Sequence, residues 1–399
     1  MSEYPLDWTV SNLGVHLKET KERACDSDII PYSVSKVLGI VPQSEKFNKR
    51  VASSDISNYK VIRKGDFAYD PMLLWDGSIN RMLREGKGAV SPAYVTFRVA
   101  SDSLDADFLL HLLKASTTKT FYKSISKGTN IRRQKAEFDD FAAGEFAFPP
   151  LPDQKKIAEI LSGIDRLILA IQNKIEKLRT AQDGLANSWD EHVHLEPVEG
   201  NLGDLIASID SGWSPACEDV PPKPGEWGVL KVSAVTKGYF CQEESKRLPS
   251  DLDARDQLLV KKDDLLITRA NGNLDLVGRG VIVNDNPASR LLMSDKILRL
   301  NPVSNANRNF LLMLLNSRHV RRQIETAVGG STGAKNIGQG LLRQIRISIP
   351  TSEDQAKIGN LSFSIYAALA ASKERRDYLI SLEKGLSSDL LSGRKRVTL

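Results

Sequence analysis

The chain has 399 residues, 41% of them hydrophobic, so it can bury more than one core, and its length predicts two or three domains. Its 55 basic and 50 acidic residues give a formal net charge of +5, which is compatible with a polyanionic partner but does not require one. We find no export signal, no apolar stretch of the roughly 20 residues that cross a membrane, and only three scattered cysteines, so we expect a cytoplasmic protein.

Short strand-like and helical segments occur in both halves of the chain. Runs rich in β-branched and aromatic residues predict strands at residues 59–62, 94–99, 265–268 and 296–300. One leucine-rich helix is predicted in each half, at residues 107–115 and 309–316. Because strands and helices do not alternate regularly, the sequence predicts a mixed α/β fold rather than a doubly wound sheet.

Several short motifs of the first half recur in the same order about 200 residues later. Asn12-Leu13-Gly14 recurs as Asn201-Leu202-Gly203, and Phe108-Leu109-Leu110 recurs as Phe310-Leu311-Leu312. The other matches are Ile62–Phe67 with Val260–Leu265, Phe97–Val99 with Leu298–Leu300, and Asp153-Gln154 with Asp354-Gln355. Each match is weak alone, but their common order predicts a duplicated architecture. Two unrelated domains with similar helices are the alternative.

A long apolar heptad follows a proline in each half of the chain. Its a positions are Ile157, Ile164, Ile171, Leu178 and Leu185, and then Ile358, Ile365, Ser372, Leu379 and Leu386. Its d positions are Ile160, Leu167, Lys174 and Ala181, and then Leu361, Ala368, Arg375 and Leu382, so that Lys174, Ser372 and Arg375 interrupt the apolar rows. The pattern predicts two helices of roughly 36 residues, or about 54 Å, that pair with each other. Packing of each helix on its own domain, or pairing between two copies of the chain, are the alternatives.

The sequence contains almost no catalytic motif. It has no glycine-rich phosphate-binding loop, no motif of the amino-methyltransferases and no metal-binding cysteine or histidine spacing. Glu-x-Lys, half of a common nuclease signature, occurs three times, once with Asp76 upstream of Glu85 and Lys87. We therefore expect a non-catalytic protein and keep a magnesium-dependent nuclease at these three residues as an alternative.

Basic segments punctuated by glycine indicate a phosphate-rich partner. Residues 116–135 contain six basic residues and no acid, together with Phe121 and Tyr122, and residues 268–273 and 318–340 are also polar. Lys and Arg contact phosphates, Arg pairs with guanine, and Asn or Gln pairs with adenine. The candidate DNA-binding residues are Lys119, Lys123, Lys127, Asn130, Arg132, Arg133, Lys135, Arg269, Asn271, Asn273, Arg321, Arg322, Lys335 and Asn336, with Gln134 and Gln339 as further candidates.

The sequence resembles the DNA specificity subunits of type I restriction–modification enzymes over essentially its whole length. The most specific part of the resemblance is the entry to the first long helix, Leu151-Pro152-Asp153-Gln154, followed by Lys156-Ile157-Ala158. Gly65-Asp66-Phe67, Ser91-Pro92-x-Tyr94 and the duplicated Phe-Leu-Leu-x-Leu-Leu also match. The second helix entry departs from the pattern, because Pro350 is followed by Thr351 and the Leu-Pro pair is missing.

The resemblance implies two tandem target recognition domains, at residues 1–150 and 191–350, which each read one part of a split duplex DNA target. Long helices at residues 151–190 and 351–393 would pair as an antiparallel coiled coil, set the spacing between the two parts and dock two methyltransferase subunits. Restriction subunits would join this complex. No cofactor is expected in this chain, since S-adenosylmethionine, ATP and magnesium would belong to the partners, and no membrane contact is expected.

Two further alternatives concern the partner of the protein. The chain could serve an enzyme in which restriction and methylation are fused, which the sequence does not separate from the type I case. It could also be a coiled-coil interaction protein that does not bind DNA.

Overall fold

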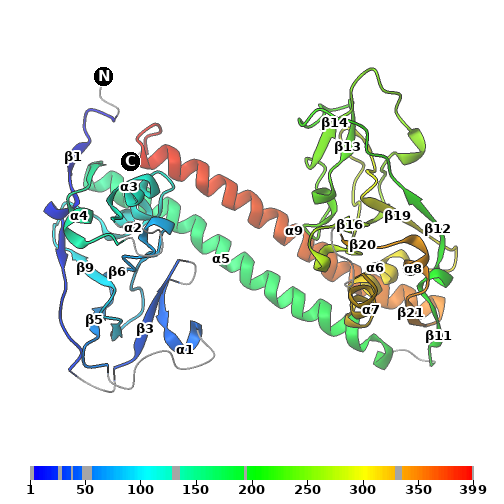
Figure 1. Cartoon of the computed structure of the whole chain (residues 1–399), viewed down its shortest axis with the longest axis horizontal. Helices are drawn as coiled ribbons and strands as arrows, with labels where there is room; N and C mark the ends of the chain where they lie inside the picture. The colour runs from blue at the N-terminus through cyan, green and yellow to red at the C-terminus, as the bar shows by residue number, and fades with distance from the viewer. Residues whose placement is uncertain are drawn as a thin grey trace. The chain divides into compact units, whose positions relative to one another are not determined.

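The computed structural model describes residues 4–25, 29–36, 39–46, 56–127, 135–192, 196–328 and 335–397. The chain forms two compact units, residues 1–169 with 379–399, and residues 170–378. Each unit contains one globular domain and parts of both long helices (Figure 1). In the described residues, we find no helix with the length and apolar character needed to cross a membrane.

The globular part of the first unit contains two four-stranded sheets. One has the strand order β2-β9-β6-β7 and the other has the order β4-β3-β8-β5, and only β3 and β8 are parallel. The strands are β1 Thr9–Asn12, β2 Leu17–Glu19, β3 Pro31–Ser35, β4 Gly39–Pro42, β5 Lys60–Arg63, β6 Phe67–Tyr69, β7 Ile79–Arg81, β8 Lys87–Val90, β9 Val95–Val99 and β10 Glu145–Phe148. The helices are α1 Gln43–Lys46, α2 Ala106–Lys114, α3 Thr118–Ile125 and α4 Phe138–Ala142, with short 3-10 helices η1 Leu13–Val15 and η2 Leu74–Asp76.

The globular part of the second unit has a similar strand order, but one of its two sheets has three strands instead of four. Its sheets have the orders β12-β19-β15-β17 and β14-β13-β18, and β13 and β18 are its parallel pair. The strands are β11 Val198–Asn201, β12 Ile206–Ser211, β13 Trp227–Leu230, β14 Ser245–Arg247, β15 Leu265–Thr268, β16 Ala270–Asn271, β17 Gly280–Ile282, β18 Arg290–Leu292, β19 Ile297–Pro302, β20 Lys335–Asn336 and β21 Arg346–Ile349. The helices are α6 Arg308–Asn316, α7 Arg318–Val328 and α8 Gln339–Arg343, with 3-10 helices η4 Trp189–His192, η5 Leu202–Leu205, η6 Val232–Val235, η7 Asp256–Leu258 and η8 Leu274–Leu276.

The sequence matches occupy the same structural positions in both domains. Leu13 and Leu202 each begin a 3-10 helix next to a two-stranded sheet, β1-β10 or β11-β21, that joins the two ends of the domain. The four predicted strands correspond to β5, β9, β15 and β19, and the two leucine-rich helices correspond to α2 and α6. The duplicated mixed α/β fold that the motif order predicts is therefore confirmed.

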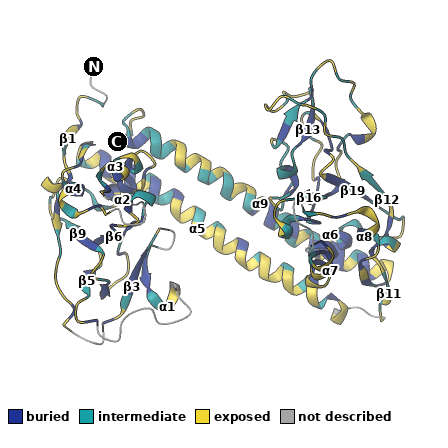
Figure 2. Cartoon of the chain, in the orientation of Figure 1, coloured by how far each residue is buried: buried dark blue, intermediate teal, exposed yellow. Residues whose placement is uncertain are grey.

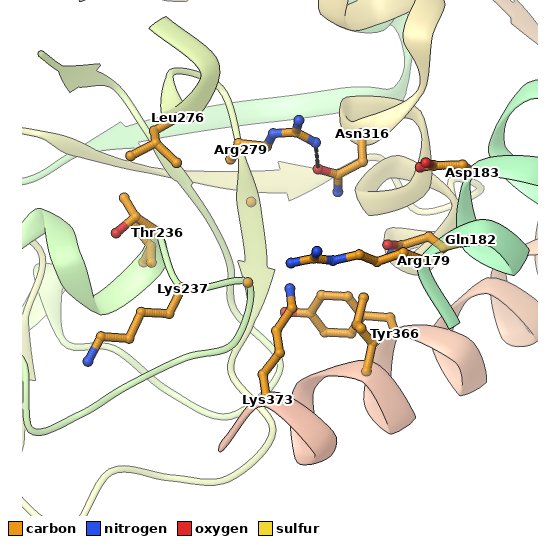
Figure 3. A pocket seen from close by; sticks show the side chains of 14 residues that line it. Arg179, Gln182, Asp183, Thr236, Lys237, Leu276, Arg279, Asn316, Tyr366 and Lys373 are labelled. Atoms are coloured by element: carbon orange, nitrogen blue, oxygen red, sulfur yellow. Dashed lines mark hydrogen bonds between the residues drawn. The ribbon is translucent and has the colours of Figure 1, made fainter. Parts of the chain in front are cut away.

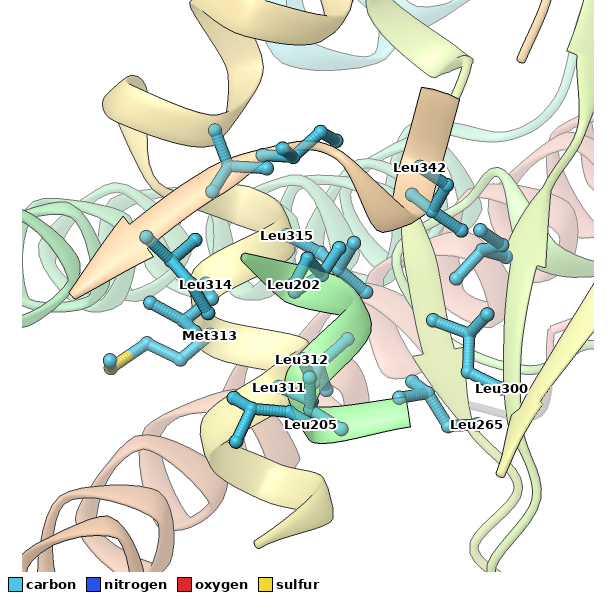
Figure 4. Packing of buried hydrophobic residues seen from close by; sticks show 14 of the residues in the cluster. Leu202, Leu205, Leu265, Leu300, Leu311, Leu312, Met313, Leu314, Leu315 and Leu342 are labelled. Carbon is cyan, nitrogen blue, oxygen red and sulfur yellow. The ribbon is translucent and has the colours of Figure 1, made fainter. Parts of the chain in front are cut away.

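Leucine-rich α6 lies at the centre of the second core. Figure 4 shows Leu311, Leu312, Leu314 and Leu315 of this helix among leucines of η5 and of the β12-β19-β15-β17 sheet. In the first unit, α2 has the same place, with Phe108, Leu109 and Leu113 buried. The Phe-Leu-Leu-x-Leu-Leu motif is thus a packing motif, which explains its duplication.

The glutamine of each helix entry connects the long helix to the helix of that motif. Gln154 is buried, its Oε1 accepts a hydrogen bond from the backbone N–H of Asp105 (2.8 Å), and its Nε2 donates to the carbonyl oxygens of Ser103 and Pro149, both at 2.9 Å. Asp105 is the N-cap of α2. Gln355 makes the equivalent bonds to the N–H of Asn307, the N-cap of α6, and to the carbonyl oxygen of Pro350.

The long helices are α5, Leu151–Ser188, and α9, Ser352–Leu391. Helix α5 begins in the first unit and ends in the second, whereas α9 runs from the second unit into the first, so the two are antiparallel within each unit (Figure 1). In the first unit, Leu390 and Leu391 of α9 belong to the same core as Leu161 of α5. In the second unit, Trp189 from just after α5 belongs to the same core as Tyr366 of α9. Each globular domain therefore packs against the ends of both long helices.

The structure buries the expected a positions of the heptad but not the expected d positions. The nine apolar a positions are buried or half-buried: Ile157, Ile164, Ile171, Leu178, Leu185, Ile358, Ile365, Leu379 and Leu386. The expected d row is wrong, because Leu167 (50%), Leu361 (55%), Lys174 and Arg375 are exposed. The inward row instead lies four residues after each a position: Leu161, Ile168, Ile175, Gln182 and Trp189, and Ser362, Leu369, Arg376, Glu383 and Leu390.

Lys174 and Ile175 distinguish the two possible inward rows of α5. Positions three and four residues after Ile157 and Ile164 are all apolar, so the start of the helix does not distinguish the two rows. One heptad later the choice is between Lys174 and Ile175, and only Ile175 is buried. Burial of the lysine ammonium would cost more than burial of the isoleucine gains, which fixes the register. Leu167, Leu169, Leu361 and Tyr378 are left exposed. Figure 2 shows exposed positions in yellow along both long helices.

This register predicts opposite outcomes for two leucines of α5. Leu161→Ala is expected to lower the free energy of unfolding by about 3 kcal/mol, because Leu161 is fully buried and the truncation leaves a cavity. Leu167→Ala is expected to change it by less than about 0.5 kcal/mol, because half of that side chain already contacts solvent. Urea denaturation followed by circular dichroism measures both changes. Equal effects of the two substitutions would contradict the assigned register.

Candidate nucleic-acid interface

The basic segment of the first domain is partly helical rather than a loop. Residues 118–125 form α3, and Tyr122 is fully buried, with its hydroxyl donating to the carbonyl oxygen of Leu113 (2.7 Å). Phe121 packs edge-on against Phe146, so neither aromatic ring lies free for base stacking. Lys123 is exposed and Lys119 is half-buried over η2. The buried face of α3 therefore orients these lysines on its outer face.

The end of the basic segment is closed by a backbone bridge. Lys127 and Lys135 exchange two backbone hydrogen bonds of 3.0 Å, which hold these two residues side by side. Both side chains are exposed, and the Lys127 ammonium pairs with Asp140 at 2.5 Å. Asn130, Arg132, Arg133 and Gln134 lie outside the described residues. The bridge therefore brings two of the predicted cations, Lys127 and Lys135, next to each other.

In the second domain, the fold brings two predicted segments together. Strand β16 pairs with β20 so that Asn271 lies opposite Lys335 and Ala270 lies opposite Asn336. The N–H of Ile337 donates to the carbonyl oxygen of Arg269, which extends this pairing (2.9 Å). Gln339 donates to the hydroxyl of Ser211 at the end of β12 (2.9 Å). One surface thus contains two groups of residues that lie more than 60 residues apart in sequence. The first group is Arg269 and Asn271, and the second is Lys335, Asn336 and Gln339.

Asn271 and Asn273 also have a local structural role. The side-chain oxygen of Asn271 accepts from the N–H of Asn273, and that of Asn273 accepts from the N–H of Asp275 at the start of η8. Two consecutive turns of this kind fix the backbone between β16 and β17. Each amide also has an NH₂ group, which is a hydrogen-bond donor.

Arg321 is wrongly assigned as a DNA-binding residue. It is only 5% exposed, and its guanidinium donates to the carbonyl oxygens of Val277, Leu274 and Asp275. Burial, and then the charge of Arg279, lowers the pKa of Arg321 to about 10. Its neighbour Arg322 is exposed on α7 and stays a candidate. The helical spacing within Arg318–Val328 points one arginine inward and the next outward, and a count of basic residues does not reveal this.

Arg255 lies over the ring of Trp213, at 4.2 Å from its centroid. This arginine is not among the candidates that the sequence indicates. The N–H of Trp213 donates to the carbonyl oxygen of Met293, and the carbonyl oxygen of nearby Lys296 accepts from the N–H of Arg269. Arg255 therefore adds an exposed cation near the β16-β20 surface. No pattern in the sequence joins these two residues, because their contact is made only by the folded sheet.

The two carboxylates of the nuclease alternative form ion pairs with lysines. Asp76 pairs with Lys36 (2.8 Å) and Glu85 pairs with Lys64, so each carboxylate has its own lysine. In the part of the chain that the structure describes, no three His, Cys, Asp or Glu side chains are grouped as metal ligands. The geometry therefore gives no support to a magnesium site at these residues.

Comparison with known proteins finds one group of relatives that are similar to this chain in sequence and in fold. Residues 70–179 match the family described as the type I restriction modification DNA specificity domain. The type I restriction enzyme MjaVIII specificity subunit of Methanocaldococcus jannaschii is 27% identical over 98% of this chain and 94% of its own length. The type I restriction enzyme EcoEI specificity subunit of Escherichia coli is 32% identical over 216 residues, which are 52% of this chain and 35% of that subunit.

A solved structure has the same fold. The crystal structure of the S subunit of a type I restriction-modification system from M. genitalium aligns with 97% of this chain and 98% of its own chain, with a TM-score of 0.68 at 15% identity. The resemblance that the motifs indicated is confirmed by the matching family, by the named relatives and by this shared fold. The chain is similar in sequence to the specificity subunits of type I restriction–modification enzymes, and it shares the fold of the M. genitalium S subunit.

Proposed function

We propose that this chain is the non-catalytic DNA-reading subunit of a type I restriction–modification complex, with one globular domain for each part of a split target. The first recognition domain is residues 1–150 and the second is residues 191–350. The observation that carries this proposal is the repeated topology with different polar surfaces at the corresponding place. Where the second domain pairs β16 with β20, the first has the Lys127–Lys135 bridge. One scaffold with two different surfaces is what a two-part target requires.

The surface cations supply phosphate contacts in this proposal, and the amides supply base contacts. Lys123, Lys127 and Lys135 are exposed on the first domain, and exposed Arg322 and half-buried Lys335 belong to the second. Contacts to phosphates position a protein on duplex DNA, whereas hydrogen bonds to base edges specify the sequence. Asn271 and Asn336 are the described residues that we assign to base contacts.

The long helices set the spacing and hold the partners in this proposal. Exposed apolar patches mark sites of protein–protein interaction. Both helices have exposed apolar side chains, Leu167 and Leu169 on α5 and Leu361 and Tyr378 on α9. We assign these faces to two methyltransferase subunits, which restriction subunits join in the cytoplasm. S-adenosylmethionine, ATP and magnesium then act in the partners.

Mapping of methylated adenines tests the proposed function. The chain is co-expressed with a candidate type I methyltransferase subunit, and the expected result is one split motif with a fixed spacer, methylated only when both proteins are present. Exchange of residues 191–350 for those of a relative should change one part of the motif and leave the other part unchanged. Methylation without this chain, or change of both parts, would contradict the proposal. The purified chain with plasmid and magnesium tests the nuclease alternative, for which cleavage is the expected result.

Docking is tested by a substitution on the exposed helix face. Leu167→Asp is expected to weaken co-purification with the methyltransferase at least tenfold, because a carboxylate in a desolvated interface lacks a partner. The stability of the isolated chain should change little, because Leu167 is half exposed. Lys174→Asp, on the same helix row, is the control for added charge. Equal binding by wild type and Leu167→Asp would remove this face from the docking surface.

A further inference from the structure

A cavity of about 400 Å³ in the second unit is lined by four cations. Arg179 comes from the second half of α5, Lys373 from the middle of α9, Arg279 from the residue before β17, and Lys237 from the loop after η6. Asp183 is the only acidic residue among the described lining residues. The volume is large enough for a phosphate group or a small phosphate ester.

Three of the four cations face the cavity (Figure 3). The Arg179 guanidinium and the Lys373 ammonium point into it beside each other, although one Arg179 nitrogen also bonds to Glu176 (2.8 Å). Arg279 is held in place by Asn316 (2.9 Å) and by the carbonyl oxygen of Asp275 (3.1 Å). Lys237 points away and pairs with Glu244. The cavity therefore concentrates positive charge at one end.

Holding these cations close together is electrostatically unfavourable. Burial, followed by the charges of Arg179, Arg376 and Arg279, lowers the pKa of Lys373 to about 8. The acids near Lys373 do not compensate: Asp377 bonds to Arg376 and to the hydroxyl of Tyr239, and Asp183 lies beside the two arginines on the α5 side. The remaining titratable lining group, Tyr366, donates no charge, since burial raises its pKa. Like charges held together in a half-buried site repel each other. An anion bound between them offsets this repulsion.

The shared topology does not require these cations. In the first unit, the heptad register places Ile380 of α9 where α5 has Arg179, and Glu383 where α5 has Gln182. There, burial and the charge of Asp165 raise the pKa of Glu383, so the corresponding place is acidic. One copy of the fold is thus stable without the basic cluster, and a purely structural role leaves the cluster unexplained.

We propose that Arg179, Arg279 and Lys373 form an oxyanion site that binds a phosphate or sulfate group. None of these three residues is among those assigned above to DNA bases or to the methyltransferase. The group can be a free phosphate or a phosphate of the DNA backbone, and both share the same chemistry. Two guanidinium groups and an ammonium group from three elements offer the charge-assisted donors that such an anion needs.

Sulfate binding by the isolated chain tests the site, because the charge of sulfate is constant from pH 6 to 10. The wild type is expected to bind sulfate in calorimetry and to melt several degrees higher in sulfate than in chloride of equal ionic strength. Lys373→Met should weaken sulfate binding at least tenfold, and in chloride it should be as stable as the wild type or more stable. Lys357→Met is the control, because Lys357 is exposed on the same helix and pairs with Glu353. No sulfate effect on the wild type, or binding by Lys373→Met within twofold, overturns the proposal.

The pH dependence is a second measurement. A lysine with a lowered pKa keeps its charge below that pKa and loses it as the pH rises, so sulfate affinity of the wild type should fall above about pH 8. The affinity that remains in Lys373→Met should not change over this range. A wild-type affinity that stays constant from pH 7 to pH 9.5 would exclude Lys373 from the site.

The source of the anion is decided by the salt dependence of DNA binding. If the site takes a backbone phosphate, Lys373→Met should reduce the slope of log affinity against log salt concentration by about 0.9. If the site takes a free phosphate, the slope stays as in the wild type and inorganic phosphate competes with sulfate. The sulfate measurement needs no DNA, so its failure leaves the proposed DNA-reading function standing.

Discussion

Gln154→Glu is expected to destabilise the first unit by about 4 kcal/mol at neutral pH. The side chain at this position is 1% exposed and donates to two carbonyl oxygens, those of Ser103 and Pro149. A glutamate carboxylate keeps the acceptor for the Asp105 N–H, but it places negative charge against both carbonyls. Burial without a partner should raise its pKa by about three units, which corresponds to about 4 kcal/mol.

The sign of the pH dependence gives a sharp test of this prediction. A glutamate whose pKa is raised in the folded state is fully compatible with folding below its unfolded pKa of about 4.3 and becomes destabilising as the pH rises through the folded value. The protonated carboxyl can donate to one carbonyl, so the variant should approach wild-type stability near pH 4. Segment-resolved hydrogen exchange of residues 103–114, compared between wild type and variant at pH 5 and pH 8, measures the change.

The equivalent and the control substitutions lie on the same pair of helices. Gln355→Glu should have the same effect on the second unit, because Gln355 bonds to the N–H of Asn307 and to the Pro350 carbonyl. Gln172→Glu changes the same chemical group on the exposed side of α5 and should be almost neutral. If Gln154→Glu is as stable as the wild type at pH 8, the buried bonds do not determine the helix entry.

Arg299→Met is expected to lower the stability of the second unit by about 4 kcal/mol. The guanidinium lies between the carboxylates of Asp210 (2.9 Å) and Asp264 (3.2 Å) and also donates to the carbonyl oxygens of Leu259 and Gln257. Its side chain is 12% exposed. Methionine fills much of the volume but leaves two half-buried carboxylates without a cation, and breaking a buried ion pair in this way typically costs about 3–5 kcal/mol.

Two further variants separate charge from packing at this site. In Arg299→Met combined with Asp264→Asn, one stranded charge is removed, so part of the lost stability should return. Arg308→Met breaks an exposed pair with Asp263 and should cost less than about 1 kcal/mol. Urea denaturation of each variant gives the free energies. A double variant no more stable than Arg299→Met would show that lost packing, rather than stranded charge, is the cause.

The sequence predicted the repeat well because its motifs carry packing and backbone bonds. Asp66 and Asp264 each accept a backbone N–H in the turn before a core strand and pair with an arginine, Arg98 or Arg299. Gln154 and Gln355 close the helix entries. Such residues stay recognisable because each one makes several short contacts that other side chains cannot reproduce.

The candidate site was only partly predictable. Arg321 is a basic residue in a basic segment, and only the packing of α7 against η8 turns it inward. The β16-β20 pairing joins segments whose closeness no local pattern indicates. Arg179, Arg279 and Lys373 come from three separate elements, so their cluster has no signature in the chain.

The sequence by itself determined the duplicated mixed α/β architecture, the two long helices and the resemblance to type I specificity subunits, because heptad spacing and recurring backbone-binding residues are local properties. The tertiary structure alone decided which face of each helix is buried, which arginine is structural, and which cations share a cavity. These outcomes depend on the burial of charge, and its free energy is set by neighbours that are distant in the chain.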